Sequence, residues 1–281
     1  MKTNQLTILG VGLIGGSVGL AAKARGLAGK VVGVGRDDRS LARAQSLGAI
    51  DEFTTDAAEG VSEADIIVVC TPVDRTATDV LAAVAAAPQR AVITDVGSTK
   101  GNILAAVQGK LPAGKAAFVG SHPLAGSEKR GPAHARADLF QDKLVIITPT
   151  AETDPEAVGV IELFWQGLGA KVIRMEADAH DQALAFTSHL PHAVAAGLAG
   201  VTPTGLLALT AGGFRDTTRI AAGDPALWSA IFRANKAAMT TALEQFQIRM
   251  EDFRRALASD NAAGLATWLT EAKQVRDALG S

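Results

Sequence analysis

A glycine-rich turn near the N-terminus has the spacing of a phosphate-binding site. Gly10, Gly12 and Gly15 form a G-x-G-x-x-G pattern that follows a short apolar run and opens a helical one. In that context the first glycine permits a tight turn, the second lets a pyrophosphate approach the backbone, and the third lets helix and strand pack closely. The predicted helix begins at Leu13 and Ile14 and supplies amide donors. We expect these five residues to bind a dinucleotide; a glycine-rich turn without a ligand is the alternative.

The end of the second predicted strand indicates which dinucleotide is bound. An NAD site usually has an acidic residue there, about 20 residues after the glycines, to hold the ribose 2′-hydroxyl. Gly35 stands at that place and Arg36 follows it. A glycine leaves room for a 2′-phosphate, and an arginine neutralises its charge. The pattern favours NADP over NAD, unless Asp37 or Asp38 serves as the acid in a shifted register.

Three further predicted strands end in residues suited to a reaction site, because ligands of open α/β sheets bind beyond the carboxyl ends of the strands. Thr71 and Pro72 end the third strand, where we expect them to line the cofactor site. Ser98 follows the fourth, either as a catalytic hydroxyl or only as the cap of the next helix. His122 follows the fifth, in a predicted loop. Its imidazole suits a proton acceptor for a hydroxyl that is oxidised; the alternative is a surface histidine.

Two arginines in the second half of the chain have the spacing of a carboxylate-binding pair. Arg215 and Arg219 follow two glycines and are four residues apart, so they share a face if the segment is helical. Guanidinium groups bind carboxylates through bidentate contacts. The alternative is that these arginines form ion pairs with Asp216 or Asp224.

His189 and His192 have a spacing that two metal ligands could share. No third ligand or carboxylate companion is evident in the sequence around them, so we expect no metal. His192 is most simply a packed helix residue. Cys70 is the single cysteine of the chain, which excludes an internal disulfide framework and a zinc site with several cysteines.

The elements that must position these residues alternate in the first half of the chain. Predicted strands cover residues 6–9, 31–34, 65–70, 91–95, 117–120, 143–148 and 171–175, with helical runs between them. This alternation predicts a Rossmann-type, doubly wound α/β sheet. After residue 175 the strand signals end, and long helical runs follow. We expect a dinucleotide-binding domain over residues 1–175 and an all-helical domain over residues 176–281.

Composition narrows the class of protein. The chain has 281 residues, of which 48% are hydrophobic and 20% charged, so it is not intrinsically disordered. A net charge of −2 gives no basic surplus for a nucleic-acid partner, and no apolar run predicts a signal peptide or a membrane span. We expect a cytoplasmic protein. Long apolar helices in a small domain favour a homodimer interface, with an exposed apolar face as the alternative.

Five stretches together resemble the prephenate/arogenate dehydrogenases of tyrosine biosynthesis. They cover nearly the whole chain in order, and the His-Pro-Leu-Ala-Gly-Ser-Glu and Phe-Arg-Asp-Thr-Thr-Arg sequences are more specific than the glycine pattern. The matching stretches are residues 10–15, 94–100, 120–128, 188–192 and 213–219.

The resemblance implies an NAD(P)-dependent oxidative decarboxylation of a cyclohexadienol that carries two carboxylates. His122 would hydrogen-bond the ring hydroxyl and help to remove its proton, and Ser98 would assist there. His189 would contact the substrate, whereas Arg219 would bind a carboxylate with Arg215 nearby. Hydride would pass to the nicotinamide and carbon dioxide would leave as the ring becomes aromatic.

The resemblance leaves the choice between prephenate and arogenate open. Gly35 and Arg36 resemble the members that use NADP, which often prefer arogenate. Glu128 and Asp216 form ion pairs at the entrance in one hypothesis, and Glu128 could contact an ammonium group. Two other functions remain alternatives: a two-domain NADP-dependent reductase of the β-hydroxyacid or pyrroline-carboxylate type, and a non-catalytic NADP-binding sensor.

Overall fold

The computed structural model describes residues 2–112, 114–127 and 129–280. The chain divides into two compact units, residues 1–235 and 236–281. The first unit holds the whole sheet and the helices that cover it, and the second is a pair of helices.

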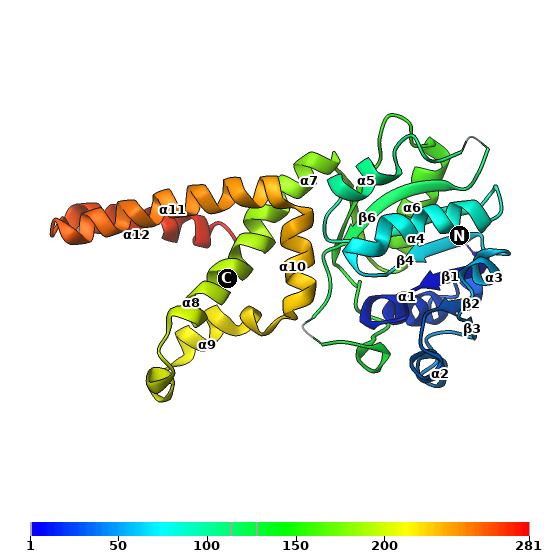
Figure 1. Cartoon of the computed structure of the whole chain (residues 1–281), viewed down its shortest axis with the longest axis horizontal. Helices are drawn as coiled ribbons and strands as arrows, with labels where there is room; N and C mark the ends of the chain where they lie inside the picture. The colour runs from blue at the N-terminus through cyan, green and yellow to red at the C-terminus, as the bar shows by residue number, and fades with distance from the viewer. Residues whose placement is uncertain (1, 113, 128, 281) are drawn as a thin grey trace. The chain divides into compact units, whose positions relative to one another are not determined.

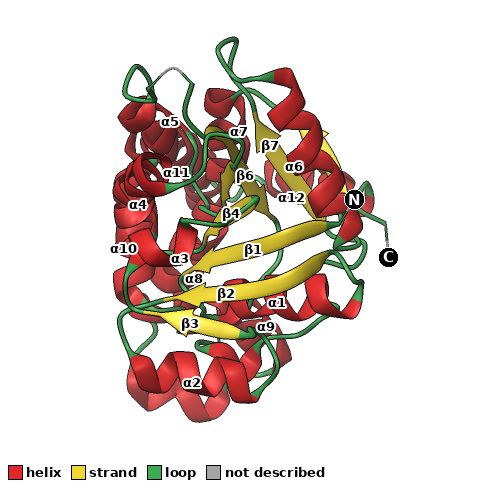
Figure 2. Ribbon diagram, turned by 90° about the vertical axis from the view of Figure 1, so that its right-hand side faces the viewer, coloured by secondary structure: helices red, strands yellow, loops and turns green. Residues whose placement is uncertain are grey.

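The first unit is built on an eight-stranded sheet with the order β3-β2-β1-β4-β5-β6-β7-β8. The strands are β1 (Thr3–Leu9), β2 (Ala28–Val34), β3 (Glu52–Thr54), β4 (Ile66–Val69), β5 (Val92–Asp95), β6 (Ala117–Pro123), β7 (Leu144–Thr148) and β8 (Lys171–Arg174). Those from β3 to β6 run parallel, and Figure 2 shows three of them, β1, β2 and β3, side by side. Strand β7 is antiparallel to β6. The strand order reverses between β1 and β4, where doubly wound sheets bind ligands.

Helices cover both faces of the sheet and bury two clusters of apolar side chains. One face carries α1 (Leu13–Ala24), α2 (Asp38–Ser46) and α6 (Pro155–Gly167), and the other carries α3 (Ala57–Val61), α4 (Val73–Ala86) and α5 (Gly101–Val107). Helix α10 (Pro225–Ala234) packs against α4 (Figure 1). Leu6 and Ile8 of β1 belong to the first cluster, whereas Ile67 and Val69 of β4 belong to the second. Because β4 is buried on both faces, all four of its residues are apolar.

The remaining helices of this unit follow the last strand. They are α7 (Ala177–Leu184), α8 (Leu190–Val201) and α9 (Gly212–Thr218), with short 3₁₀ turns at Pro132–His134, Thr204–Leu209 and Arg219–Ala222. A single π-helical turn, Ala185–His189, joins α7 to α8. Pro191 lies in the first turn of α8, directly after the π-helical turn, and because it has no N–H it cannot donate a hydrogen bond to that turn. Single π-helical turns inside α-helices are frequent at functional sites.

The second unit consists of α11 (Lys236–Ala258) and α12 (Ala262–Asp277). The Asn261 side chain accepts the Gly264 amide and so caps α12. Trp268 binds across the pair, because its indole Nε1 donates to the Arg249 carbonyl at 3.0 Å and its ring packs against Phe253. Within the described ranges, no helix has the length and apolar character to cross a membrane.

The predicted doubly wound sheet followed by helices is confirmed, with two corrections in its detail. Strand β3 was not predicted, because Glu52–Thr54 is a three-residue edge strand without a buried apolar run. His122 was predicted in a loop but lies inside β6, opposite Ile146 of β7. Helices replace strands near residue 176, whereas the compact units divide after residue 235. The functional division into residues 1–175 and 176–281 therefore stays a prediction.

Candidate active site

The glycine turn between β1 and α1 is closed on its protein side and open on the other. Gly10 has a φ of +94°, and a Cβ there would lie 2.8 Å from the carbonyl oxygen of Cys70. A Cβ on Gly15 would lie 2.3 Å from the carbonyl oxygen of Gly10. A Cβ on Gly12 would meet no atom within 4 Å. The turn therefore has room for a ligand at Gly12 and for nothing larger than hydrogen at the other two positions.

The cavities beside this turn fit a dinucleotide. One of about 610 Å³ extends from Gly10 past Gly35 to Arg36, and Thr71 and Pro72 line it. The hydroxyl of Thr71 is buried and has no hydrogen-bond partner among the described residues. A buried hydroxyl without a partner is costly, so this atom is suited to a polar ligand. Together with the open Gly12, it makes the residues present compatible with a bound pyrophosphate and ribose.

Two further cavities meet at the carboxyl ends of β5 and β6. One of about 760 Å³ runs from Leu13 and Ile14 past the glycine turn. The other, of about 690 Å³, extends toward α8 and α10. Ser98 and His122 line both cavities. A ligand in the first cavity and a ligand in the second would therefore meet beside these two side chains.

Ser98 does not cap the helix that follows it. Helix α5 begins at Gly101, and its first amides are bound instead by the carboxylate of Asp181 from α7, which accepts Lys100 N at 2.8 Å and Gly101 N at 2.9 Å. The Ser98 hydroxyl makes no hydrogen bond within the described part of the chain and is half-buried at the boundary between the cavities. It is therefore available to a ligand.

A buried ion pair holds the Ser98 turn against the end of β6. Lys100 and Asp95 are both fully buried and in contact, and the Lys100 ammonium also donates to the Ser121 carbonyl at 2.8 Å. The Asp95 carboxylate accepts the amides of Gly97 at 2.8 Å and Ser121 at 3.0 Å. Because the residues next to Ser98 and His122 bind the same buried carboxylate, the two functional side chains keep a fixed separation.

His122 projects from β6 with one ring nitrogen occupied. Its Nδ1 lies 2.9 Å from Nε2 of His180, a fully buried residue of α7. Burial is the largest cause that holds the pKa of His122 well below its ordinary value, and the positive charge of Lys100 acts in the same direction. The ring is therefore neutral near pH 7, and a neutral imidazole can accept a proton.

His189, from the π-helical turn, lines the same cavity as His122. The side-chain amide of Asn235 donates to the Asp181 carbonyl at 2.7 Å and to Nδ1 of His189 at 3.1 Å. Nδ1 is thus an acceptor, so Nε2 carries the hydrogen. Nε2 is buried without a partner among the described residues, and burial lowers the pKa of His189 to about 4. His189 can donate one hydrogen bond to a ligand in the cavity.

The charged side chains around this cavity are mostly basic. Arg219 lines it, together with Lys129 and Arg130, and Arg130 pairs with Asp224. Arg215 is exposed and does not line it. The predicted alternative, in which Arg215 or Arg219 pairs with Asp216 or Asp224, is not seen among the described ion pairs. Glu128, which was predicted at the entrance, lies outside the described residues.

The three cavities together are lined by every predicted site residue except Arg215. Those of the cofactor site line the two cavities beside the glycine turn, and Ser98 and His122 join these to the cavity that holds His189 and Arg219. Arg215 alone stays apart. His180, Asp181 and Asn235 were missed, although they orient the predicted histidines. An adjacent histidine and aspartate in a helix carry no spacing signal, so only their packing reveals them.

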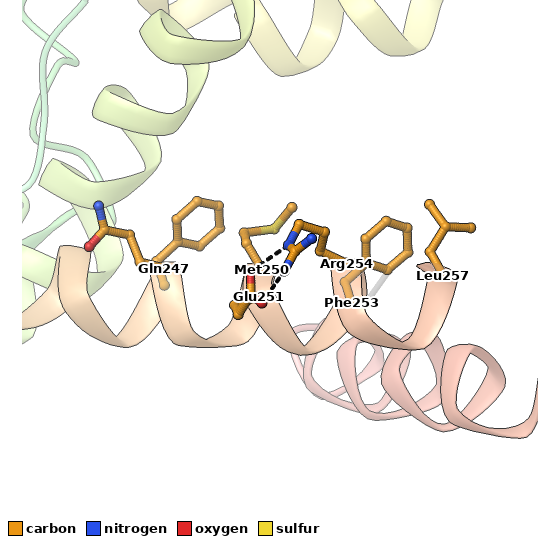
Figure 3. A pocket seen from close by; sticks show the side chains of 7 residues that line it. Gln247, Met250, Glu251, Phe253, Arg254 and Leu257 are labelled. Atoms are coloured by element: carbon orange, nitrogen blue, oxygen red, sulfur yellow. Dashed lines mark hydrogen bonds and ion pairs between the residues drawn. The ribbon is translucent and has the colours of Figure 1, made fainter. Parts of the chain in front are cut away.

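A different hollow belongs to the second unit alone (Figure 3). It has a volume of about 520 Å³ and lies along one face of α11, with Phe246, Met250, Phe253 and Leu257 as its apolar lining. Its charged groups, Arg254 and Glu251, bind each other at 2.7 Å. The residues that line the hollow include no histidine, cysteine, serine or lysine.

Models of two protein domains match this chain. A model of the prephenate dehydrogenase nucleotide-binding domain matches residues 18–174, and a model of the prephenate dehydrogenase dimerization domain matches residues 176–271. The cyclohexadienyl dehydrogenase of Zymomonas mobilis is 37% identical over 98% of this chain and 96% of its own length.

Solved structures agree with these matches. A prephenate dehydrogenase from Aquifex aeolicus, in complex with hydroxyphenyl propionate and NAD⁺, is 31% identical with a TM-score of 0.91 and covers 99% of both chains. An arogenate dehydrogenase from Synechocystis is 28% identical with a TM-score of 0.82, over 98% of this chain and 99% of its own. A Plasmodium falciparum pyrroline carboxylate reductase, at 11% identity and a TM-score of 0.51, shares the fold alone, so that alternative is not favoured. Since the two family models together match well over half of its length, this chain belongs to the prephenate dehydrogenase family.

Proposed function

We propose that this chain oxidises and decarboxylates a cyclohexadienol, prephenate or arogenate, with NADP as the preferred cofactor. The observation that carries the proposal is the junction of two cavities at Ser98 and His122. One cavity begins at a turn suited to pyrophosphate, and the other is lined by His189 and Arg219. Such a junction suits hydride transfer, in which cofactor and substrate must be in contact.

The charges of the second cavity suit the substrate. Prephenate carries a ring carboxylate and a side-chain carboxylate, and Arg219 can bind one of them through bidentate hydrogen bonds. His189 Nε2 donates a further hydrogen bond, and Lys129 adds positive charge. Arg215 is exposed, so its proposed role is attraction of the anion toward the cavity and not contact within it.

His122 manages the proton of the reaction. Since Nδ1 faces His180, Nε2 is the atom that accepts the proton of the ring hydroxyl, with Ser98 as a second hydrogen-bond partner of that oxygen. When bound, the nicotinamide supplies the acceptor for the hydride that leaves the carbinol carbon. Loss of the ring carboxylate as carbon dioxide makes the ring aromatic, and His122 returns its proton to the phenolate oxygen. The reaction then releases no net proton, so a buried base needs no path to solvent.

The preference for NADP is supported by the end of β2. Arg36 is exposed beside the cavity that Gly35 lines. The neighbouring acid, Asp37, is already used, because its carboxylate accepts the amides of Arg39 at 3.3 Å and Ser40 at 3.2 Å as the cap of α2. A carboxylate held in this way is poorly placed to bind a ribose 2′-hydroxyl, whereas Arg36 is free to bind a 2′-phosphate.

The proposed assembly is a homodimer through the helical region. Large apolar side chains on α11 and α12 are exposed, including Ile248 at 63%, Leu257 at 59% and Leu269 at 57%. Apolar surface of this kind calls for a covering partner. The match of residues 176–271 to a dimerization-domain model supports a second copy of the chain as that partner.

One assay tests the function. The purified chain is mixed with prephenate or arogenate and with NADP or NAD, and the absorbance of the reduced nicotinamide is followed. We expect turnover, fastest with NADP, and the two substrate rates decide which substrate is preferred. An enzyme that reduces neither cofactor in any of the four pairs would overturn the proposal, and faster turnover with NAD would overturn the cofactor preference.

A further inference from the structure

His122 is hydrogen-bonded to a second histidine, His180, which is fully buried and is itself hydrogen-bonded to the carboxylate of Asp181. His180 Nε2 is 2.9 Å from His122 Nδ1, and the other nitrogen of His180, Nδ1, is 2.8 Å from the Asp181 carboxylate. The two imidazole rings meet edge to face, with centroids 5.1 Å apart and planes at 69°. Three side chains from β6 and α7 thus form one hydrogen-bonded line that ends at the junction of the cavities.

Asp181, at the end of this line that is furthest from the cavities, determines which nitrogen of each histidine carries a hydrogen. Asp181 accepts the amides of Lys100 and Gly101, and hydrogen bonds from these and from His180 hold the pKa of Asp181 below its ordinary value against the effect of burial. A carboxylate can only accept, so His180 Nδ1 must carry the hydrogen. In the neutral ring, His180 Nε2 is then an acceptor, and His122 Nδ1 must donate to it.

This order leaves one atom for chemistry. With its hydrogen on Nδ1, His122 has a bare lone pair on Nε2. The opposite tautomer would place a hydrogen on Nε2 and could not accept a proton from a hydroxyl there. The line of three residues therefore selects the tautomer in which His122 is a base.

We propose that His180, held by Asp181, is a positioning residue that fixes the ring orientation and the tautomer of His122. The role rests on the proposed function, because the tautomer matters only if His122 accepts the substrate proton. His180 also lies between the positive charge formed on His122 and the negative charge of Asp181, so it couples the two when the proton is held.

Other charged groups near His122 do not replace this line. The groups near it from neighbouring elements are Lys100, which pairs with Asp95 at the end of β5, and His189 from the π-helical turn. Lys100 has no acceptor to offer and is occupied by Asp95 and the Ser121 carbonyl. His189 binds Asn235 through Nδ1. Only His180 offers a ring nitrogen to His122 within the described residues.

The variants His180→Phe and His180→Gln distinguish the hydrogen bond that His180 accepts from His122 from the space that its side chain fills. Phenylalanine fills the space but offers no acceptor, whereas the glutamine side-chain oxygen can reach the place of His180 Nε2 and accept from His122. The matched control is His134→Phe, at an exposed histidine of the Pro132–His134 turn. We expect kcat to fall about 100-fold in His180→Phe and less than tenfold in His180→Gln. The control keeps the kcat of the unchanged protein, and KM changes less than threefold in all three variants.

A direct reading of the tautomer needs neither substrate nor turnover. In protein labelled with ¹⁵N-histidine, the ring nitrogens of each histidine show by NMR which one carries the hydrogen, and the His122→Asn protein identifies the signals of residue 122. We expect His122 to carry its hydrogen on Nδ1 in the unchanged protein and in His180→Gln, and to become a mixture of tautomers in His180→Phe.

Three results would overturn the inference. They are a hydrogen on Nε2 of His122 in the unchanged protein, no change of its tautomer in His180→Phe, and a kcat within twofold of normal in a folded His180→Phe protein. If His180→Phe does not fold, the tautomer in the unchanged protein still decides. A chain that turns over no cyclohexadienol but shows the expected tautomers would refute the proposed function and leave the geometry of the line intact.

Discussion

The cofactor side of the site and the substrate side meet at Ser98 and His122, but they are assembled from the chain in different ways. On the cofactor side, six consecutive residues, from Gly10 directly after β1 to Gly15 in the first turn of α1, form the site, and the ligand meets their backbone. On the substrate side, every group is a side chain, and His122 meets His180 across 58 residues of sequence.

The difference shows what each side depends on. The glycine turn depends on the absence of side chains, because a Cβ at Gly15 would collide with the backbone. The substrate side depends on side-chain nitrogens held in one orientation, by Asp181 for His180 and by Asn235 for His189. A substitution should therefore act through shape on the first side and through hydrogen bonding and charge on the second.

The largest effect is expected where the two sides meet. His122→Asn keeps a polar side chain but removes the proton acceptor, and positioned acid–base groups contribute about 10²–10⁴-fold. We expect kcat to fall about 10³-fold while NADP binding, measured by calorimetry, stays unchanged. Near-normal turnover in this variant would remove His122 from the chemistry.

The second prediction breaks the cofactor side by shape alone. Gly15→Ala places a Cβ 2.3 Å from the Gly10 carbonyl oxygen, whereas Gly12→Ala meets no protein atom within 4 Å. Without cofactor, we expect the free energy of unfolding to fall by about 2–3 kcal/mol in Gly15→Ala and to change little in Gly12→Ala. Both variants should bind NADP more weakly. Equal stability of the two variants, measured by denaturant unfolding, would contradict this account of the turn.

The third prediction sharpens the chemistry of the cofactor side. Arg36→Ser removes the charge proposed to bind the 2′-phosphate, and a hydrogen bond to a charged group contributes about 1.5–3 kcal/mol. We expect KM for NADP to rise by at least about tenfold, with KM for NAD nearly unchanged. Arg39→Ser, at an exposed arginine one turn further on, is the control. A parallel rise of both KM values would assign Arg36 to some other part of the dinucleotide.

The smallest effect concerns stability on the substrate side. The pKa of His189 is about 4 in the folded chain, below the ordinary value of 6.5, so the unfolded chain binds a proton first as the pH falls. Stability from this residue is complete above pH 6.5 and is lost as the pH falls toward 4, with a slope of up to about 1.4 kcal/mol per pH unit. We expect a loss of about 1 kcal/mol between pH 6.5 and 5.5 in urea unfolding at fixed protein concentration. His189→Asn should reduce that loss, and an unchanged pH dependence in the variant would contradict a neutral, buried His189.

The same contrast explains what could be predicted from the sequence. The glycine turn and the doubly wound sheet could be predicted because short sequence patterns encode them. These patterns are the spacing of Gly10, Gly12 and Gly15 and the alternating apolar runs. His122 was found, but its place in a strand was not. Proline after the histidine argued for a loop, whereas the end of β6 pairs with β7, an antiparallel neighbour whose register no local pattern specifies.

The residues that orient the site were beyond local patterns. The Ser98 hydroxyl was weighed as a helix cap, yet Asp181 caps α5 from 80 residues away. His180 and Asp181 precede the π-helical turn as an ordinary helical pair, and their roles arise from contacts with β6 and α5. Long-range hydrogen bonds between side chain and backbone leave no periodicity in the sequence, so the structure was needed to find them.

The antiparallel pairing of β6 with β7 has a consequence for how the protein loses activity. His122 belongs to the sheet itself, with Ser121 fully buried before it and Pro123 buried after it. Its backbone can move only when that part of the sheet opens, so local breathing of surface loops leaves the base in register. Amide exchange around residue 122 should thus follow the slowest, cooperative openings of the first unit. On heating, the protein should lose its activity at the temperature at which the sheet unfolds.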